Sequence, residues 1–317
     1  MPSNQSPLGA LPSRFRRERL LIVGCGDVGL RVAQQLKARV VMRALTTTPS
    51  RTQGLRHAGV APLAGNLDEP ASLRRLAGIA TRVIHLAPPA NEQSGAWWRD
   101  FRTQALARTL GLRTPPRSFV YASTSGVYGD CQGALVTEAR PPNPRTPRAQ
   151  RRIDAERLVR HFGRRIGVPV SVLRVPGIYG PGRSPNARDR LLQGAPVLRP
   201  EDDVYTNHIH ADDLAHAVIA AMWRGRAQRT YNATDDTQLM AGDYYQLAAD
   251  IFELPRPKRV PRSAAKQELT LNALSFMNES RRLSNVRLKK ELRVRLKFPT
   301  VREGLIEMKK LLGPAPG

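Results

Sequence analysis

The stretch that decides the fold is Leu20-Leu21-Ile22-Val23-Gly24-Cys25-Gly26-Asp27-Val28-Gly29. Four apolar residues with a buried-strand pattern run into Gly-x-Gly-x-x-Gly, and a helical pattern follows. The first glycine permits a tight turn, the second lets the backbone approach a pyrophosphate, and the third lets the helix pack on the strand. The alternative is a glycine-rich turn without a ligand. The strand–turn–helix context favours a nucleotide cofactor, contacted by Gly24, Gly26, Asp27, Val28 and Gly29.

Apolar runs alternate with helical patterns along the chain. This alternation predicts an α/β fold, a doubly wound parallel sheet of the Rossmann type with helices on both faces. The expected strands are 20–23, 40–45, 82–86, 118–122, 170–175 and 230–233. The expected helices are 29–38, 72–77, 97–110, 148–162 and 212–223.

The same pattern predicts the domain organisation. Residues 19–175, completed by 204–235, are expected to form an NAD(P)-binding Rossmann domain. Residues 176–203 and 236–313 are expected to form a smaller C-terminal substrate lobe, because they fall outside the strand–helix alternation. Residues 1–18 are expected to be a disordered basic lead-in, since they combine prolines, small polar residues and arginines.

The charge of the chain is strongly positive: 51 Lys and Arg stand against 26 Asp and Glu among 317 residues, a net +25. Such an excess attracts polyanions. A polyanion site would gather basic residues on one face, whereas an even spread among acids would indicate coding bias. The basic stretches lack aromatic residues on which single strands stack. We therefore expect no specific nucleic-acid partner. The residues that would adjoin the 148–165 helix in a polyanion site are Arg281, Arg282, Arg287, Lys289 and Lys290.

Cysteine content and hydropathy bear on location. Cys25 and Cys131 offer neither a disulfide framework nor metal-ligand spacing. No apolar run approaches the roughly 20 residues that span a bilayer. Residues 1–13 contain no apolar signal-peptide segment. We expect a cytoplasmic protein that does not contact a membrane.

Several short motifs follow the glycine turn in a fixed order. They are GNLD at 65–68, VIHLA at 83–87, YASTSGVYGD at 121–130, LRVPGIYGPG at 173–182, HIHADDLA at 208–215 and YNAT at 231–234. Together they resemble the NAD-dependent epimerase/dehydratase family, the extended short-chain dehydrogenases/reductases, over roughly residues 20–310. The resemblance implies a nicotinamide cofactor and a small-molecule substrate whose identity the motifs do not specify.

In that family a Ser or Thr hydroxyl orients the substrate oxygen, a Tyr moves the proton, and a Lys lowers the pKa of the Tyr. Alignment on the VYG segment places Thr124 at the hydroxyl position. The Tyr-x-x-x-Lys pair falls at Arg148 and Arg152. An arginine pKa above about 12 leaves no neutral form to act as a base at pH 7. The resemblance leaves Tyr128 and Tyr179 as candidate proton donors.

The residues after the second strand bear on the choice of cofactor. NAD binding usually requires an acid about 20 residues beyond the glycines, to bind the ribose 2′-OH. Here Thr46, Thr47 and Arg51 follow instead, with no carboxylate. Hydroxyls with an arginine suit the 2′-phosphate of NADP better, and a loop that binds either form is the alternative. The remaining expected cofactor contacts are Asn66, Leu67, Ala87, Pro88, Ser123, Arg152 and Pro176.

These residues predict an NAD(P)-dependent oxidoreductase or epimerase/dehydratase-like enzyme with NADP preferred over NAD. Its substrate would be a small polar carbonyl or hydroxyl compound. Thr124 would bind the reacting oxygen, and Tyr128, Tyr179 or a bound water would supply the proton. The alternative is a non-catalytic NADP(H)-binding redox sensor or scaffold, because the Tyr and the Lys are absent.

Three further features have structural interpretations. The resemblance places His208 and His210 along the cleft rather than on a metal, and Asp212 is expected to cap the following helix. Trp97 and Trp98 are expected to begin a helix and pack in the core. The alternative for this tryptophan pair is a homodimer interface.

Overall fold

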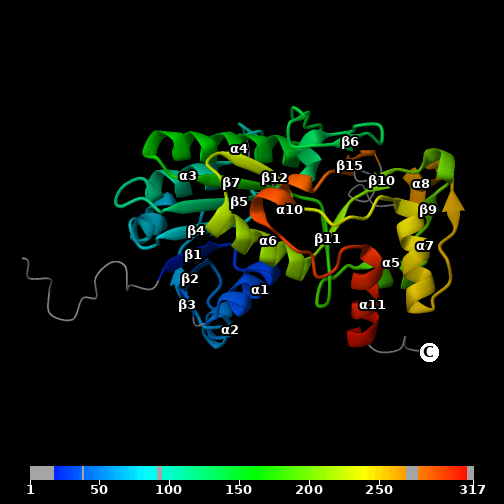
Figure 1. The fold of residues 1–317 in the computed structure, drawn as a ribbon, viewed down its shortest axis with the longest axis horizontal. Helices are drawn as coiled ribbons and strands as arrows, with labels where there is room; N and C mark the ends of the chain where they lie inside the picture. Colours follow the sequence, from blue (N-terminus) through cyan, green and yellow to red (C-terminus); the bar gives the residue numbers. More distant parts are fainter. Residues whose placement is uncertain (1–17, 38, 91–94, 269–277, 313–317) are drawn as a thin grey trace, which may run out of the picture.

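Seven parallel strands form one sheet in the computed structural model (Figure 1). The structure describes residues 18–37, 39–90, 95–268 and 278–312. The order of the strands across the sheet is β3-β2-β1-β4-β5-β7-β12. Their bounds are β1 Arg19–Val23, β2 Val41–Thr46, β3 Val60–Ala64, β4 Arg82–His85, β5 Ser118–Thr124, β7 Val170–Val175 and β12 Arg229–Asn232. The predicted fold class is confirmed, and β3 adds an edge strand to the six that were expected.

Helices cover both faces of the sheet, because successive residues of each buried strand point to opposite sides. Leu20 and Ile22 of β1 belong to one core cluster, while Leu21 and Val23 belong to the other. The first cluster is completed by α1 (Asp27–Leu36), α6 (Ala211–Arg224) and α10 (Val286–Leu292). The second is completed by η2 (Pro70–Leu76), α3 (Phe101–Leu110) and α4 (Pro147–Ile166). Helix α2 (Arg51–His57) connects β2 to β3.

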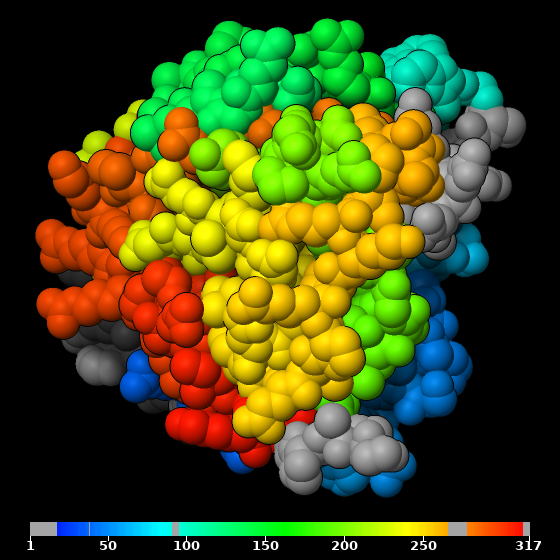
Figure 2. Space-filling view, turned by 90° about the vertical axis from the view of Figure 1, so that its right-hand side faces the viewer, coloured from blue at the N-terminus to red at the C-terminus, as the bar shows by residue number. Residues whose placement is uncertain are grey.

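A second group of elements lies beyond β7 and β12, on the right of Figure 1. Its own core joins Tyr179, Tyr244 and Leu305. Short strand pairs connect it: β8 with β11, β10 with β13, β9 with β14, and β6 with β15. Figure 2 shows the face formed by α7, β14 and α11. The bounds are η3 Ser125–Tyr128, β6 Leu135–Val136, β8 Gly177–Tyr179, α5 Ala187–Leu192, β9 Val197–Leu198, η4 Pro200–Asp202, β10 Tyr205–Thr206, β11 His208–His210, β13 Leu239–Met240, α7 Ala241–Phe252, β14 Arg259–Val260, α8 Arg262–Glu268, β15 Arg282–Leu283 and α11 Val301–Leu312.

The N-terminal ends of α3 and α6 overturn two expectations. Helix α3 begins at Phe101, because the Asp100 carboxylate accepts a hydrogen bond from Thr103 N at 3.1 Å and caps it. Trp97 and Trp98 precede this cap and are 45% and 48% exposed, so the expectation of core packing was wrong. The homodimer interface stays a prediction.

Helix α6 begins at Ala211, and its cap is the imidazole of His210, which accepts from Asp212 N at 3.2 Å. The expectation that Asp212 caps this helix was therefore wrong, since its carboxylate binds Arg31 instead.

The expected lead-in, apart from Glu18, lies outside the described residues. Among the helices of the described segments, none is both long and apolar enough to cross a membrane.

Candidate functional site

The glycine turn after β1 has a shape that a side chain at Gly24 would prevent and one at Gly29 would crowd. Gly24 has a φ of +88°, and a Cβ there would lie 2.4 Å from the backbone nitrogen of Ala87. A Cβ at Gly29 would lie 3.3 Å from the Gly24 carbonyl oxygen, so the absence of a side chain lets α1 approach β1 closely. At Gly26 a Cβ would meet no described atom within 4 Å. The turn therefore leaves open space at the N-terminus of α1, where free backbone N–H groups can bind a pyrophosphate.

Charged side chains surround the first turn of α1. The Asp27 carboxylate binds Arg31 at 2.8 Å and Arg183 at 2.7 Å. Arg31 also donates to Asp212 and to the carbonyl oxygen of Pro181, each at 2.5 Å. Burial raises the pKa of Asp27, but the hydrogen bonds from the two arginines outweigh it and hold that pKa below its usual value. These bonds join the glycine turn to the loop after β8.

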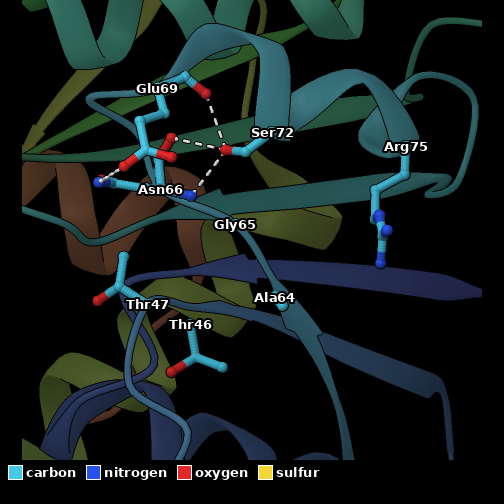
Figure 3. A pocket seen from close by; sticks show the side chains of 8 residues that line it. All are labelled: Thr46, Thr47, Ala64, Gly65, Asn66, Glu69, Ser72 and Arg75. Atoms are coloured by element: carbon cyan, nitrogen blue, oxygen red, sulfur yellow. Dashed lines mark hydrogen bonds between the residues drawn. The ribbon is translucent and has the colours of Figure 1, made fainter.

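A hollow of about 380 Å³ lies at the carboxyl ends of β2 and β3 (Figure 3). Thr46 and Thr47 lie across this hollow from Asn66, whose amide donates to Glu69 at 3.0 Å. Arg75 of η2 lies to one side of the hollow. It was not among the predicted residues, since a basic residue in a short helical segment carries no motif. The complete lining is Thr46, Thr47, Ala64, Gly65, Asn66, Glu69, Ser72 and Arg75.

Arg51 and Leu67 do not line this hollow. The Arg51 guanidinium donates to the Cys25 carbonyl oxygen at 2.6 Å, so it lies beside the glycine turn. Leu67 is only 8% exposed and packs in the core of the sheet. A cofactor contact at Leu67 would therefore involve mainly its backbone.

The other predicted cofactor positions follow neighbouring strands. Ala87 and Pro88 follow β4, and the Ala87 nitrogen donates to Val23 O at 3.1 Å. Ser123 lies near the end of β5 and is 4% exposed, while Pro176 links β7 to β8. Because all these strands are parallel, their carboxyl ends meet at one edge, where α/β sheets bind ligands. The fold thus brings the predicted cofactor residues to one edge of the sheet.

The end of β5 carries the predicted hydroxyl. Thr124 is half-buried and caps η3, and its Oγ1 accepts from Gly126 N at 3.2 Å. Arg152, at the family's lysine position, donates from Nη1 to Ala122 O at 2.6 Å and to the Tyr121 hydroxyl at 3.2 Å. Arg148 lies one turn earlier on α4. Partial burial and the charge of Arg152 lower the pKa of Arg148, and no shift of this kind makes an arginine a base at pH 7.

Both candidate tyrosines are buried and hydrogen-bonded to other residues of the protein. Tyr128 is 1% exposed, and its hydroxyl donates to Asn232 Oδ1 at 2.8 Å. Tyr179 is 5% exposed, and its hydroxyl donates to Thr300 O at 3.4 Å. Burial raises the pKa of each phenol above its usual value. Both side chains are thus buried and hydrogen-bonded within the protein.

The two histidines of β11 are packed among aromatic rings. His208 stacks on Tyr244 with ring centroids 4.1 Å apart, and His210 contacts Phe298 at 4.0 Å. Burial lowers the pKa of both imidazoles to about 4. In the segments that the structure describes, no three His, Cys, Asp or Glu residues form a group able to hold a metal.

One acidic residue of this region was missed by the sequence reasoning. Glu279 lies beside Gly126, with its Oε2 3.9 Å from the point that a Cβ on Gly126 would occupy. It follows Thr124 by more than 150 positions and belongs to none of the quoted motifs. The pairing of β15 with β6 brings the two segments together.

The model of the NAD-dependent epimerase/dehydratase family matches residues 20–234, which is more than half of the 317 residues. The chain belongs to this family. A curated relative, the uncharacterized protein y4nG of Sinorhizobium fredii, is 28% identical over 218 residues, 66% of this chain and 54% of that protein. The chain thus matches about half the length of that relative.

Solved structures are similar over nearly the whole chain. A conserved protein of unknown function from Silicibacter pomeroyi has a TM-score of 0.77 at 28% identity, covering 93% of this chain and 99% of that one. The dTDP-glucose 4,6-dehydratase of Bacillus anthracis, solved with NAD, has a TM-score of 0.75 at 16% identity, with 92% and 96% covered. At that identity the second likeness concerns the fold alone.

Proposed function

We propose that this chain is an NAD(P)-dependent oxidoreductase or epimerase/dehydratase-like enzyme for a small polar carbonyl or hydroxyl compound. The observation that carries this proposal is the placement of the glycine turn and Thr124 at one edge of one parallel sheet. A bound nicotinamide would supply hydride transfer. The open space at Gly26 would receive the pyrophosphate, and Thr124 would donate a hydrogen bond to the reacting oxygen of the substrate.

We propose NADP as the preferred cofactor. Two hydroxyls, Thr46 and Thr47, and the guanidinium of Arg75 line the hollow at the ends of β2 and β3. Arg51 lies beside the glycine turn through its bond to Cys25. No carboxylate follows β2 before Arg51 to pair with a 2′-OH. The guanidinium of Arg75 in the hollow and that of Arg51 beside the glycine turn would each suit an additional phosphate.

The second candidate is a non-catalytic NADP(H)-binding sensor or scaffold. Specific observations favour it: Arg148 and Arg152 occupy the tyrosine and lysine positions, and both remaining motif tyrosines are buried and bonded. Such a protein would bind the cofactor at the glycine turn without turning over a substrate.

Fluorescence titration with NADPH and NADH, followed by turnover assays over nucleotide sugars, aldehydes and ketones, separates these candidates. We expect NADPH to bind more tightly than NADH, and Arg51→Gln to weaken NADPH binding about tenfold by removing a charge-assisted bond. The matched control is Arg56→Gln, an exposed arginine on the same helix, which should change neither affinity. Equal or tighter binding of NADH would overturn the NADP preference.

The turnover arm tests catalysis. Thr124→Ala should reduce turnover of any compound that the wild type converts, because the substrate oxygen loses a hydrogen bond. Unchanged turnover in Thr124→Ala would remove the catalytic assignment. Cofactor binding without turnover of any compound would favour the sensor.

We also propose that the protein is cytoplasmic, works without a specific nucleic-acid partner and forms a homodimer. Both thiols are free, which suits a reducing compartment. Several basic residues near the C-terminus pair with acids of the chain: Arg281 with Glu279, Arg287 with Glu138, and Lys289 with Asp236. The exposed Trp97 and Trp98 support the dimer, which size-exclusion chromatography with light scattering would detect.

A further inference from the structure

A carboxylate and a hydroxyl border the same small space at the end of β5. A methyl group added at Gly126 would lie 3.6 Å from Thr124 Oγ1 and 3.9 Å from Glu279 Oε2. The two oxygens therefore approach one point from different segments of the chain. The hydroxyl and the carboxylate therefore lie on the same side of Gly126, where a compound bound against this glycine would face both.

Glu279 is held in place by its neighbours. Arg281 binds its Oε2 at 2.7 Å and also donates to Gly129 O at 2.8 Å. The next backbone nitrogen, of Ser280, donates to Asp130 at 2.8 Å. Arg281 is 8% exposed, so its guanidinium is largely shielded from solvent. These contacts fix the carboxylate against the loop that follows η3, as a preorganised site requires.

Glu279 also lies within electrostatic reach of the residue at the family's tyrosine position. Its negative charge opposes the lowering of the pKa of Arg148 by burial and by Arg152. An arginine cannot exchange a proton at neutral pH, whereas a carboxylate can. Tyr128 and Tyr179 are buried and hydrogen-bonded elsewhere. Glu279 is thus the group beside Thr124 whose chemistry matches the absent phenol.

We propose that Glu279 is the proton-transfer residue of this site, an inference that rests on the proposed function. In the oxidative direction the Glu279 carboxylate takes the proton of the substrate hydroxyl, and the O–H bond breaks as the Glu279 O–H bond forms. A bound oxidised nicotinamide nucleotide would accept the hydride from the same carbon, so that a carbonyl and a protonated Glu279 would result. Thr124 donates a hydrogen bond to the reacting oxygen throughout.

The test compares Glu279→Gln with the wild type. The amide keeps an oxygen for Arg281 but cannot accept the proton. The control is Glu201→Gln, an exposed carboxylate on η4, which should behave as the wild type. The first readout needs no substrate: calorimetry of NADP⁺ and NADPH binding. The oxidised ring is positively charged, so loss of the nearby carboxylate should weaken NADP⁺ binding about fivefold and leave NADPH binding unchanged.

The second readout is turnover over the panel of carbonyl and hydroxyl compounds. Glu279→Gln should lower kcat at least about a hundredfold, the usual effect of losing a general acid or base. Glu279→Asp keeps the carboxylate and its charge beside Arg281, so it should retain more activity than Glu279→Gln. It replaces Glu279→Gln in the test if the amide variant does not fold.

The outcomes separate the two proposals. A wild type that binds neither nucleotide contradicts the proposed function itself, and the role of Glu279 falls with it. A wild type that binds and turns over substrate, with Glu279→Gln within about threefold of it, overturns only the role of Glu279. If the wild type binds both nucleotides but converts no compound, an unchanged NADP⁺-to-NADPH affinity ratio in Glu279→Gln overturns it as well.

Discussion

Asp235 is a buried carboxyl whose ionisation opposes folding. It follows β12 and is 2% exposed. Its Oδ1 accepts from Thr237 N at 2.9 Å, while Oδ2 has no hydrogen-bond partner among the described residues. Burial raises the pKa of this carboxyl to about 8. The protonated form is therefore the one that suits the folded chain near neutral pH.

We expect Asp235→Asn to become increasingly stabilising, relative to the wild type, between pH 5 and pH 8. The folded pKa of about 8 exceeds the unfolded value of about 3.9. The stabilisation that protonated Asp235 gives the wild type is therefore complete below the unfolded pKa. This stabilisation is lost as the pH rises through the folded pKa. The neutral amide does not titrate, so the difference in unfolding free energy should grow by up to about 1.4 kcal/mol per pH unit. Urea denaturation at several pH values measures it.

The control for this prediction is Asp250→Asn on α7. Asp250 is exposed, and the hydrogen bond from Arg256 lowers its pKa, so its contribution stays constant above the unfolded pKa. The Asp250→Asn and wild-type curves should run parallel from pH 5 to pH 8. A constant difference for Asp235→Asn over the same range would contradict the assignment of the titration to Asp235.

At the residue scale, local chemistry could be predicted and distant partners could not. The conformations of Gly24 and Gly29 follow from the turn itself, and the structure shows the close contacts that the pattern implies. The partner of the Tyr128 hydroxyl, Asn232, could not be predicted because β12 brings it there from more than 100 positions along the chain. Glu279 was missed because its position depends on strand pairing far along the chain.

At the element scale, strong periodicity predicted that a helix or strand exists better than it predicted where that element begins and ends. Strand β3 escaped prediction because Pro62 interrupts its pattern, which an edge strand tolerates because one side of its backbone needs no partner. The early start predicted for α3 followed the apolar run at Trp97, whereas the cap at Asp100 sets the true beginning. A side-chain cap competes with hydrophobic periodicity, and periodicity alone does not reveal which one decides.

Helix α4 should depend measurably on its cap. The Thr146 hydroxyl accepts from Ala149 N at 3.2 Å, and Pro147 occupies the first helical turn. Thr146→Ala should lower the free energy of unfolding by about 1 kcal/mol, as the loss of such caps usually does. Thr137→Ala, in an exposed loop, is the matched control. Equal midpoints and slopes in urea for Thr146→Ala and the control would show that the cap contributes nothing.

At the scale of the whole molecule, the charge of +25 should produce weak and salt-sensitive binding to nucleic acid. About six phosphate contacts lose roughly a thousandfold in affinity between 50 and 200 mM salt. We expect fluorescence anisotropy with a labelled duplex to show binding at low salt that disappears near about 150 mM, whatever the sequence. Heparin should compete as well as DNA. Sub-micromolar affinity at about 150 mM salt would show that nucleic acid is a genuine partner.

The order of strands across the sheet has a consequence for how the chain is made. Helix α1 packs against α6, and β7 pairs with β12, so the core around β1 is closed by segments from the second half of the chain. A ribosome synthesises β1 and α1 long before α6 emerges from the exit tunnel. The nascent chain must therefore carry an uncovered apolar surface through most of translation, and non-local pairing of this kind slows folding. We therefore expect this topology to make the nascent chain depend on chaperones during synthesis.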